Sequence, residues 1–375
     1  MILNAEQQAI AESVRAFAQQ RIKPLSQQFE SKRGYPKKLF EELAELGLMG
    51  MTAPEAVGGT GADHVSYALA LMEVAAADGA LSTILSIQNS LMIAALLKEG
   101  NAQQQARFLP GLIGGTMIGA FALTEADAGS DAAAVRTRAV RKGKGYVLNG
   151  SKQFITSGKI AGLALVFAVT DPEARRKGIS AFLVPTDRKG YIVDKVEHKL
   201  GQQASDTCSL RFDDLYIEDE LRLGPEGKGY QIALANLETG RIGIAAQCIG
   251  MAQAALDHAV EYAKQRRSMG KIIMDHQAVG FRLADLAARL EAARQLVLHA
   301  ACVKDTGAPC LKEASMAKLV ASEVAEAVCS GALQTLGGYG YIEDFRVAKI
   351  YRDVRVCQIY EGTSDIQRMV ISRSL

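Results

Sequence analysis

The distribution of proline constrains this chain more than any other feature of its sequence. Seven of the eight prolines lie between residues 24 and 225, and only Pro309 follows. Proline interrupts helix interiors, whereas the stretch after residue 225 is rich in the strong helix formers Ala, Leu, Glu, Lys and Arg. We therefore expect long helices over residues 226–375. Apolar residues recur every three or four positions from Ala292 to Ala325, and the turn at 307–309 predicts an antiparallel helical hairpin.

The remainder of the chain divides into a helical block and a β-rich block. Amphipathic stretches near residues 5–30, 37–47, 64–98 and 102–113 indicate helices. Short runs rich in β-branched and aromatic residues, separated by polar turns, indicate strands at 146–156, 163–169, 179–187, 190–196 and 208–217. This order predicts an α+β fold without Rossmann-type βαβ alternation. Its expected parts are an N-terminal helical domain (1–115), a middle antiparallel β domain (116–222) and a C-terminal helical domain (223–375).

Charge and cysteine content exclude several classes of function. The 43 Lys and Arg residues against 41 Asp and Glu leave a net charge of +2, so no strong field attracts nucleic acid or anionic membranes. The six cysteines form no C-x-x-C pair and the five histidines no metal-binding pattern, which predicts reduced core thiols and no metal site. No stretch of about 18 uninterrupted apolar residues occurs. We expect an intracellular protein without membrane insertion.

Two polar segments of the middle block could hold a ligand. In 121–131 (FALTEADAGSD), small residues and hydroxyls could let backbone amides approach an anion or a planar ring; a plain junction loop is an equal alternative. In 154–158 (FITSG), after an Asn-Gly pair that predicts a turn, an aromatic and hydroxyls could contact a ring cofactor. From this segment alone, an ordinary hairpin is favoured.

Three further segments lie in the C-terminal block. The glycines of 334–341 (QTLGGYGY) indicate either a helix C-cap or close approach to a phosphate or another chain. Arg266 lies in a basic segment (262–270) that is either a solvated helix end or a phosphate clamp.

The last segment, 359–367 (IYEGTSDIQ), places a glutamate directly before a glycine. Ser364 and Gln367 form a capping-box pattern that would begin the final helix. This leaves Glu361 unexplained. In a partly desolvated loop its pKa could rise into the range of a working base, although from this segment alone a surface glutamate is favoured.

Taken in order, seven segments resemble the acyl-CoA dehydrogenase family along essentially the whole chain. They are residues 35–63, 122–131 (ALTEADAGSD), 148–158 (LNGSKQFITSG), 199–207 (KLGQQASDT), 263–270 (AKQRRSMG), 334–341 (QTLGGYGY) and 359–368 (IYEGTSDIQR). The resemblance implies an N-terminal helical domain, a middle β domain and a C-terminal four-helix domain, in agreement with the proline distribution.

The resemblance also implies FAD as cofactor, with a site shared between subunits. The implied contacts of one subunit are Phe121, Leu123, Thr124, Ser130, Phe154, Thr156, Met269, Thr363 and Asp365, with Arg266 at the pyrophosphate. Those that serve the FAD of a neighbouring subunit are Gln277, Gln334, Gly337 and Gly338.

For the reaction, the resemblance implies that Glu361 removes the α-proton of an acyl-CoA thioester while the β-hydride passes to flavin N5. The product is a trans-2-enoyl-CoA. Ser130, Glu238, Arg241 and Gly362 match substrate positions, although Glu238 and Arg241 could instead be an exposed helix pair. In isovaleryl and long-chain members the base precedes the arginine that matches Arg241, and that position is Gly240 here.

The chain departs from the family pattern at Ala126-Asp127, where Pro-Gly is usual, at Met269, where Phe is usual, and at Phe154, where Trp is common. Locally, 238–247 looks most like short-chain members. The implied partners are an electron transfer flavoprotein and further copies in a homotetramer, in the cytoplasm or, after removal of a transit peptide, in the mitochondrial matrix. The alternatives are a same-fold acyl-CoA oxidase or flavin monooxygenase, and a non-enzymatic helical scaffold.

Overall fold

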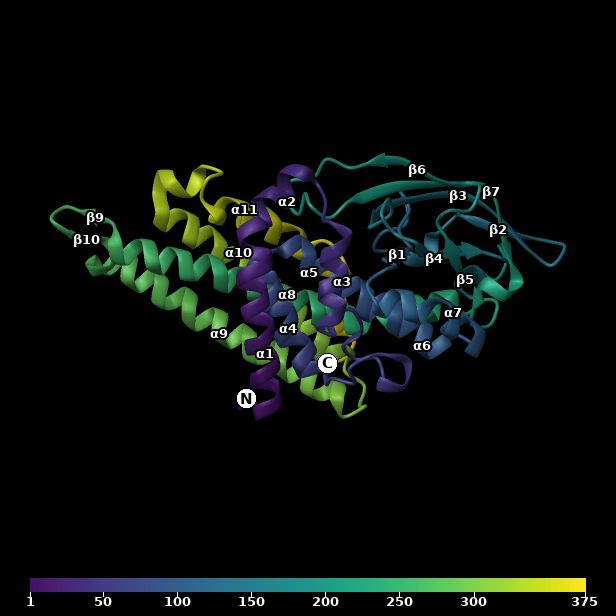
Figure 1. Ribbon diagram of the computed structural model, residues 1–375, viewed down its shortest axis with the longest axis horizontal. Helices are drawn as coiled ribbons and strands as arrows, with labels where there is room; N and C mark the ends of the chain where they lie inside the picture. Colours follow the sequence, from purple (N-terminus) through teal and green to yellow (C-terminus); the bar gives the residue numbers. More distant parts are fainter.

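The first part of the chain is helical, as its amphipathic pattern predicts. The computed structural model describes all residues, 1–375 (Figure 1). The N-terminal helices are α1 (Ala5–Phe17), α2 (Ser26–Lys32), α3 (Lys37–Glu45), α4 (His64–Ala77), α5 (Gly79–Ser86), α6 (Ala94–Glu99) and α7 (Ala102–Ile113). Asn4 and Asn101 begin α1 and α7, each in a reciprocal capping box with the glutamine three residues later.

One helical run, from Gly79 to Glu99, is long and apolar enough to cross a membrane, but 89% of its most apolar 18-residue stretch is buried inside the protein. It comprises α5, a π-helical segment (Ile87–Ile93) and α6. Burial against other elements explains its apolar composition, so it is a core helix of the fold.

The middle of the chain forms a sheet of eight strands. They are β1 (Gly119–Ala122), β2 (Arg138–Lys142), β3 (Gly145–Thr156), β4 (Leu163–Val169), β5 (Ile179–Pro185), β6 (Tyr191–Val196), β7 (Thr207–Glu218) and β8 (Arg222–Leu223). The order is β6-β7-β3-β2-β4-β5-β8, with β1 paired to β4. The β domain is confirmed, but the sheet is mixed, since β1 runs parallel to β4 and β2 meets β4 in parallel at one residue pair.

The predicted turn at Asn149-Gly150 is wrong. These residues lie inside β3, where the register against β7 shifts between Leu148 and Gly150. Gly150 has φ +146, which suits a bulge. The hairpin turn lies earlier, at the glycine-lysine sequence that joins β2 to β3.

The last part of the chain contains three long helices and two short ones. They are α8 (Gly229–Gln265), α9 (Gln277–Asp305), α10 (Leu311–Leu336), α11 (Arg346–Val354) and α12 (Ser364–Ser372), with a hairpin of β9 (Arg267–Ser268) and β10 (Lys271–Ile272) between α8 and α9. The helical domain and the turn near residue 308 are confirmed. Helix α4 packs closely on α8, because an added Cβ at Gly250 would lie 2.0 Å from the Met72 carbonyl oxygen.

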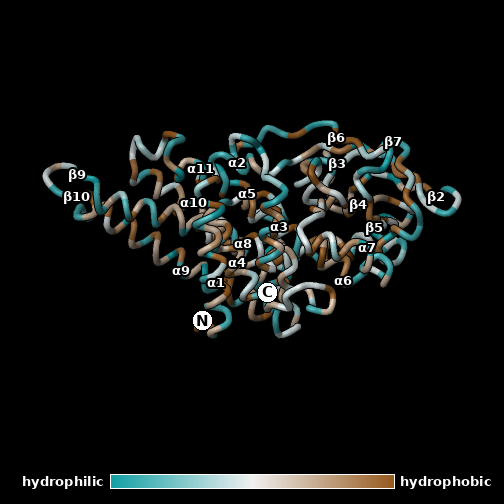
Figure 2. The backbone as a smooth tube through the Cα atoms, in the orientation of Figure 1, coloured by the Kyte–Doolittle hydropathy of each residue, from teal (hydrophilic) through white to brown (hydrophobic).

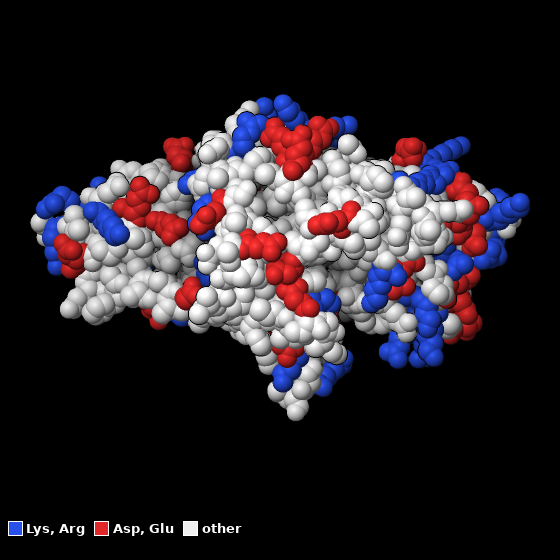
Figure 3. Space-filling view, turned by 60° about the horizontal axis from the view of Figure 1, so that its bottom comes forward, with Lys and Arg blue, Asp and Glu red and all other residues white.

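Two hydrophobic cores hold these parts together. One joins α1 to α5 with the C-terminal helices, and the other joins the sheet with α6, α7 and the start of α8. Figure 2 shows hydrophobic segments concentrated in β4, β5 and the packed helices, with hydrophilic segments at the exposed turns. Figure 3 shows acidic and basic side chains interspersed over one face, as the near-neutral charge predicts. All six cysteines are free.

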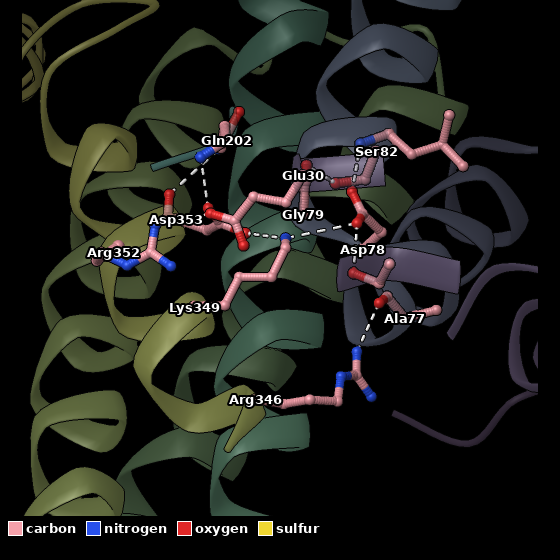
Figure 4. A network of polar contacts seen from close by, with 12 residues as sticks. Glu30, Ala77, Asp78, Gly79, Ser82, Gln202, Arg346, Lys349, Arg352 and Asp353 are labelled. Atoms are coloured by element: carbon pink, nitrogen blue, oxygen red, sulfur yellow. Dashed lines mark hydrogen bonds and ion pairs between the residues drawn. The ribbon is translucent and has the colours of Figure 1, made fainter. Parts of the chain in front are cut away.

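A buried ionic cluster ties the three parts of the chain together (Figure 4). The Lys349 ammonium on α11 contacts the carboxylates of Asp78, 3.4 Å away at the start of α5, and Asp353. Asp353 accepts a hydrogen bond from the backbone N–H of Gln202, in the loop between β6 and β7. Burial by itself would raise the pKa of Asp78. The Lys349 charge and the hydroxyl groups of Ser26 and Tyr35 outweigh this effect and hold that pKa below its ordinary value.

Replacing Lys349 by methionine should destabilise the protein strongly. Two buried carboxylates would lose their cation, and breaking a buried ion pair from one side typically costs about 3–5 kcal/mol. Urea unfolding monitored by circular dichroism measures this loss. The control is Arg15→Met, which removes the exposed ion pair with Glu73 and should cost about 1 kcal/mol or less. Equal losses in the two variants would contradict the structural role of the cluster.

Candidate active site

The two polar segments of the β domain lie side by side. The backbone N–H of Gln153 donates to the Thr124 carbonyl oxygen at 2.9 Å, and the Lys152 ammonium donates to the Leu123 carbonyl oxygen at 3.0 Å. These contacts connect the loop after β1 to the end of β3. The sequence-predicted residues of both segments therefore belong to one surface.

Lys152 is a positioning residue that sequence reasoning missed. It is buried and contacts Glu125 at 2.7 Å. Glu125 also accepts the backbone N–H groups of Arg136 and Thr137. Burial lowers the pKa of Lys152 to about 8, and Glu125 opposes this shift. The ion pair thus holds the 122–131 loop against β3, and Lys152 lies within the predicted 148–158 motif without an assigned role there.

The predicted contact residues differ in exposure. The Phe154 ring is 64% exposed on a left-handed backbone, so it is free to pack against a ligand. Phe121 is half-buried and packs on Phe167, with ring centroids 4.9 Å apart, so it also belongs to the core of the sheet. Thr156 is half-buried opposite Thr207 in the sheet, and Ser130 is exposed in its loop.

Glu361 lies in the short loop before α12, with its carboxylate directed at α8. An added Cβ at Gly240 would lie 2.1 Å from Glu361 Oε2. That oxygen is buried and has no hydrogen-bond partner. Burial raises the pKa of Glu361 to about 7, and the positive charges of Lys318 and Arg241 oppose the rise. A carboxylate of this kind is suited to exchange protons near neutral pH.

The start of α12 corrects the predicted capping box. Thr363, not Ser364, is the N-cap, and its hydroxyl accepts the N–H of Ile366. The Gln367 side chain donates to the carbonyl oxygens of Glu361 and Gly362, at 3.2 and 2.9 Å. Gln367 therefore fixes the loop that carries Glu361.

Asp365, predicted at the cofactor, is exposed in the first turn of α12 and contacts Arg368. Nothing in the fold of one chain buries it.

Glu238 and Arg241 are not an exposed pair. Arg241, the residue after Gly240 on α8, is buried, donates to Ser315 Oγ at 3.3 Å, and has an unpartnered Nε. Glu238 is half-buried and contacts Lys304 at 2.9 Å. An unsatisfied guanidinium nitrogen beside Glu361 favours binding of a polar ligand there.

A chain of buried hydrogen bonds links the β domain to the residue before Glu361. Gln202 Oε1 accepts the Thr83 hydroxyl at 2.7 Å, and Gln247 Nε2 donates to the same Thr83 oxygen at 2.6 Å. Gln247 Oε1 accepts the Tyr360 hydroxyl at 2.5 Å. These residues, which sequence reasoning did not single out, orient the segment that carries Glu361.

The remaining predicted residues gather at the far tip of the helical bundle. Arg266, Gly337 and Gly338 line a pocket of about 480 Å³, in which Arg266 lies over the Tyr339 ring. Gly337, at φ +60, ends α10, so the C-cap prediction is confirmed. The other predicted residues at this tip, all exposed, are Gln277 at the start of α9, Gln334 near the end of α10, and Met269 in the β9–β10 turn.

One chain does not bring all the predicted residues together. Arg266 and Met269, which were expected to serve the same FAD as Phe121 and Phe154 within one subunit, lie instead at the tip with Gly337 and Gly338. In Figure 1 the β9–β10 tip and the sheet lie at opposite ends of the molecule. The two groups can meet only if the tip of one chain reaches the sheet of another.

Backbone strain marks both groups. Phe154, Met269 and Glu361 have φ values of +58, +49 and +51, which non-glycine residues rarely adopt. Such residues tend to cluster at ligand sites.

The chain belongs to the acyl-CoA dehydrogenase family. The models of its N-terminal, middle and C-terminal domains match residues 4–116, 120–215 and 227–375. An acyl-CoA dehydrogenase of Bacillus subtilis is 47% identical, over all of this chain and 99% of that protein. The mitochondrial short-chain specific acyl-CoA dehydrogenase of Mus musculus is 44% identical, over 98% and 89%.

Two further comparisons bear on substrate and partner. The structure of butyryl-CoA dehydrogenase from Megasphaera elsdenii matches with a TM-score of 0.97 and 42% identity, covering 100% of this chain and 99% of that one. The caffeyl-CoA reductase-Etf complex subunit CarC of Acetobacterium woodii is 42% identical, over 100% of this chain and 99% of that protein. Members of the family are FAD-binding flavoproteins.

Proposed function

We propose that this protein catalyses the FAD-dependent α,β-dehydrogenation of an acyl-CoA thioester to a trans-2-enoyl-CoA, with Glu361 as the base that removes the α-proton. The observation that carries the proposal is the buried, unpartnered Oε2 of Glu361. Because its pKa is raised to about 7, the carboxylate is ionised just above neutral pH and still basic enough to take a proton.

Other groups of this chain act around that carboxylate. The backbone N–H of Glu361 donates to no acceptor of the protein and is free to bind the thioester oxygen, where negative charge develops as the proton leaves. Arg241, with its unpartnered Nε, adds positive charge on the α8 side. The buried surroundings exclude water, which strengthens these electrostatic contacts.

The residues present fit FAD as cofactor. An added Cβ at Gly337 or Gly338 meets no atom within 4 Å, so this backbone is open to a ligand. Arg266 lies in the same pocket with a guanidinium suited to a phosphate. At the opposite end of the molecule, on β3, Phe154 presents a free ring. When bound, FAD supplies the acceptor for the β-hydride.

Anaerobic mixing with butyryl-CoA tests the proposed function. We expect the flavin absorbance to bleach, and we expect only slow recovery on exposure to air. Rapid reoxidation by oxygen would favour an acyl-CoA oxidase. A colourless protein that takes up no flavin would favour a helical scaffold.

We further propose a short acyl-CoA as substrate, an electron transfer flavoprotein as electron acceptor, and a homotetramer as the assembly. The named activity of the butyryl-CoA dehydrogenase supports the first, and the Etf complex of the CarC relative supports the second. The predicted cofactor residues lie at two opposite ends of the molecule, which supports the third, an assembly in which two chains share one FAD site. We place the protein in the cytoplasm or in the mitochondrial matrix, and the mouse relative is named as mitochondrial.

Replacing Arg266 by alanine should lower both flavin content and tetramer stability, because a charge-assisted phosphate contact joins the two chains. Flavin absorbance and light scattering of holo and apo protein measure the two effects. The neighbouring Arg267, which lies outside the pocket, is the matched control, and Arg267→Ala should keep its flavin. A stable monomer with full FAD would rule out a shared site.

A further inference from the structure

Three lysines are buried in this protein, and one of them lacks an acidic contact. Lys152 contacts Glu125 at 2.7 Å, and Lys349 contacts Asp78 and Asp353. Lys318, on α10, has no exposed surface and makes a single hydrogen bond, from Nζ to the Gly362 carbonyl oxygen at 2.7 Å. A buried ammonium without a counter-charge is costly, so a nearby negative charge is needed to retain it in the ionised form.

The hydrogen bond of Lys318 reaches the carbonyl group of Gly362, the residue that follows Glu361. Glu361 and Gly362 are both left-handed, with φ values of +51 and +90. For a glutamate this conformation is unfavourable and persists only where surrounding contacts enforce it. The Gly362 carbonyl oxygen accepts from Lys318 on one side and from Gln367 on the other, so these two donors hold the turn.

We propose that Lys318 is a positioning residue for the catalytic carboxylate: its ammonium anchors the Gly362 carbonyl, which holds Glu361 in its left-handed conformation, and balances the negative charge of Glu361. This inference rests on the proposed role of Glu361 as the base.

The charged and titratable groups around Glu361 come from three packed helices. Lys318 lies on α10, Arg241 and Glu238 on α8, and Tyr67 on α4. Of the two cations that oppose the burial effect on the pKa of Glu361, Lys318 has the larger influence. Burial in turn lowers the pKa of Lys318. The thiols of Cys248 and Cys357 oppose that shift, and so does the Glu361 carboxylate. Lys318 and Glu361 therefore favour each other's charged forms.

Two substitutions separate the hydrogen bond from the charge. Lys318→Gln keeps a donor for the Gly362 carbonyl but removes the charge, and Lys318→Met removes both. The first measurement is an infrared pH titration of the substrate-free holoenzyme. It follows the carboxylic-acid C=O band that Glu361→Gln abolishes. In both variants the pKa of Glu361 should rise by about one unit or more, because an opposite charge has been removed.

The second measurement is single-turnover flavin reduction by butyryl-CoA at a pH where Glu361 is ionised. Lys318→Met should be slower than Lys318→Gln by about tenfold or more, since small displacements of a catalytic group have large effects on rate. The control is Lys312→Met, in the first turn of the same helix, which should change neither the titration nor the rate.

The outcomes are decisive in either direction. If the pKa of Glu361 is unchanged in both variants, Lys318 does not balance the charge of Glu361. If Lys318→Gln, Lys318→Met and the wild-type protein reduce flavin at equal rates, Lys318 does not anchor the Glu361 turn. If Lys318→Met does not fold, the titration and rate of Lys318→Gln still test the charge balance. If Glu361→Gln itself reduces flavin normally, the proposed base is wrong, whereas the infrared titration still reports whether Lys318 controls Glu361.

Discussion

Glu361→Gln should slow single-turnover flavin reduction by about 10²–10⁴-fold, the usual contribution of a positioned general base. The amide has nearly the same shape as the carboxylate, and the proposed flavin contacts Arg266, Thr363 and Asp365 remain, so FAD content should be normal. In the wild-type protein the rate should rise with pH through about 7, because only the ionised form of Glu361 accepts a proton. The rise of the flavin-reduction rate with pH should be absent in Glu361→Gln.

Thermal unfolding supplies the control for this substitution. The pKa of Glu361 is raised in the folded state, so this group favours folding at low pH and loses that contribution as pH rises through about 7. Glu361→Gln should therefore be at least as stable as wild type at pH 8. Near-normal bleaching in a folded variant would remove Glu361 from the mechanism.

Glu361→Gly should be essentially inactive, and adding Gly240→Glu should return part of the activity. An added Cβ at Gly240 points to within 2.1 Å of Glu361 Oε2, so removal of Glu361 vacates the space that a Gly240→Glu side chain would enter. The substitution also favours the α8 helix by about 1 kcal/mol in propensity. Recovery should be partial, because a carboxylate on Gly240 would lack the Lys318 and Gln367 contacts that hold the loop of Glu361 in place.

The assay is single-turnover flavin reduction by the double variant against Glu361→Gly alone. The matched control carries Gly240→Gln with Glu361→Gly, which has the same bulk without a base and should show no recovery. A double variant that folds, binds FAD and acyl-CoA, and gains nothing would mean that Gly240 does not face the reacting carbon.

Local sequence signals predicted the elements with strong periodicity or clear terminators. The hairpin of α9 and α10 and the strands β3 to β7 are confirmed, because proline, glycine and alternation of polar and apolar residues act within one segment. The shorter β1 and β2 were not singled out, since each has only four or five residues, and β1 in addition pairs with β4, about 40 residues further along the chain. The Asn-Gly bulge and the Thr363 cap were misassigned because two local patterns competed at each position.

For the candidate site, the sequence predicted Glu361, Arg241 and the polar loops, through their resemblance to a family. It did not predict Lys152, Lys318 or Gln247, which are single polar residues within otherwise ordinary strands and helices. What distinguishes them is burial and the identity of their partners. Both depend on contacts between segments far apart in the chain, as in the bond from Lys318 to Gly362.

By itself, then, the sequence determined the order of helical and β-rich parts, the near-neutral charge and the residue types available for chemistry, since these depend on composition and short-range pattern. Only the tertiary structure decided that Glu361 Oε2 is buried against Gly240, that Lys318 holds the turn after Glu361, and that the predicted cofactor residues separate into two distant groups. The physical reason is that desolvation and charge pairing act through space, so the pKa and position of a side chain depend on which helices pack around it.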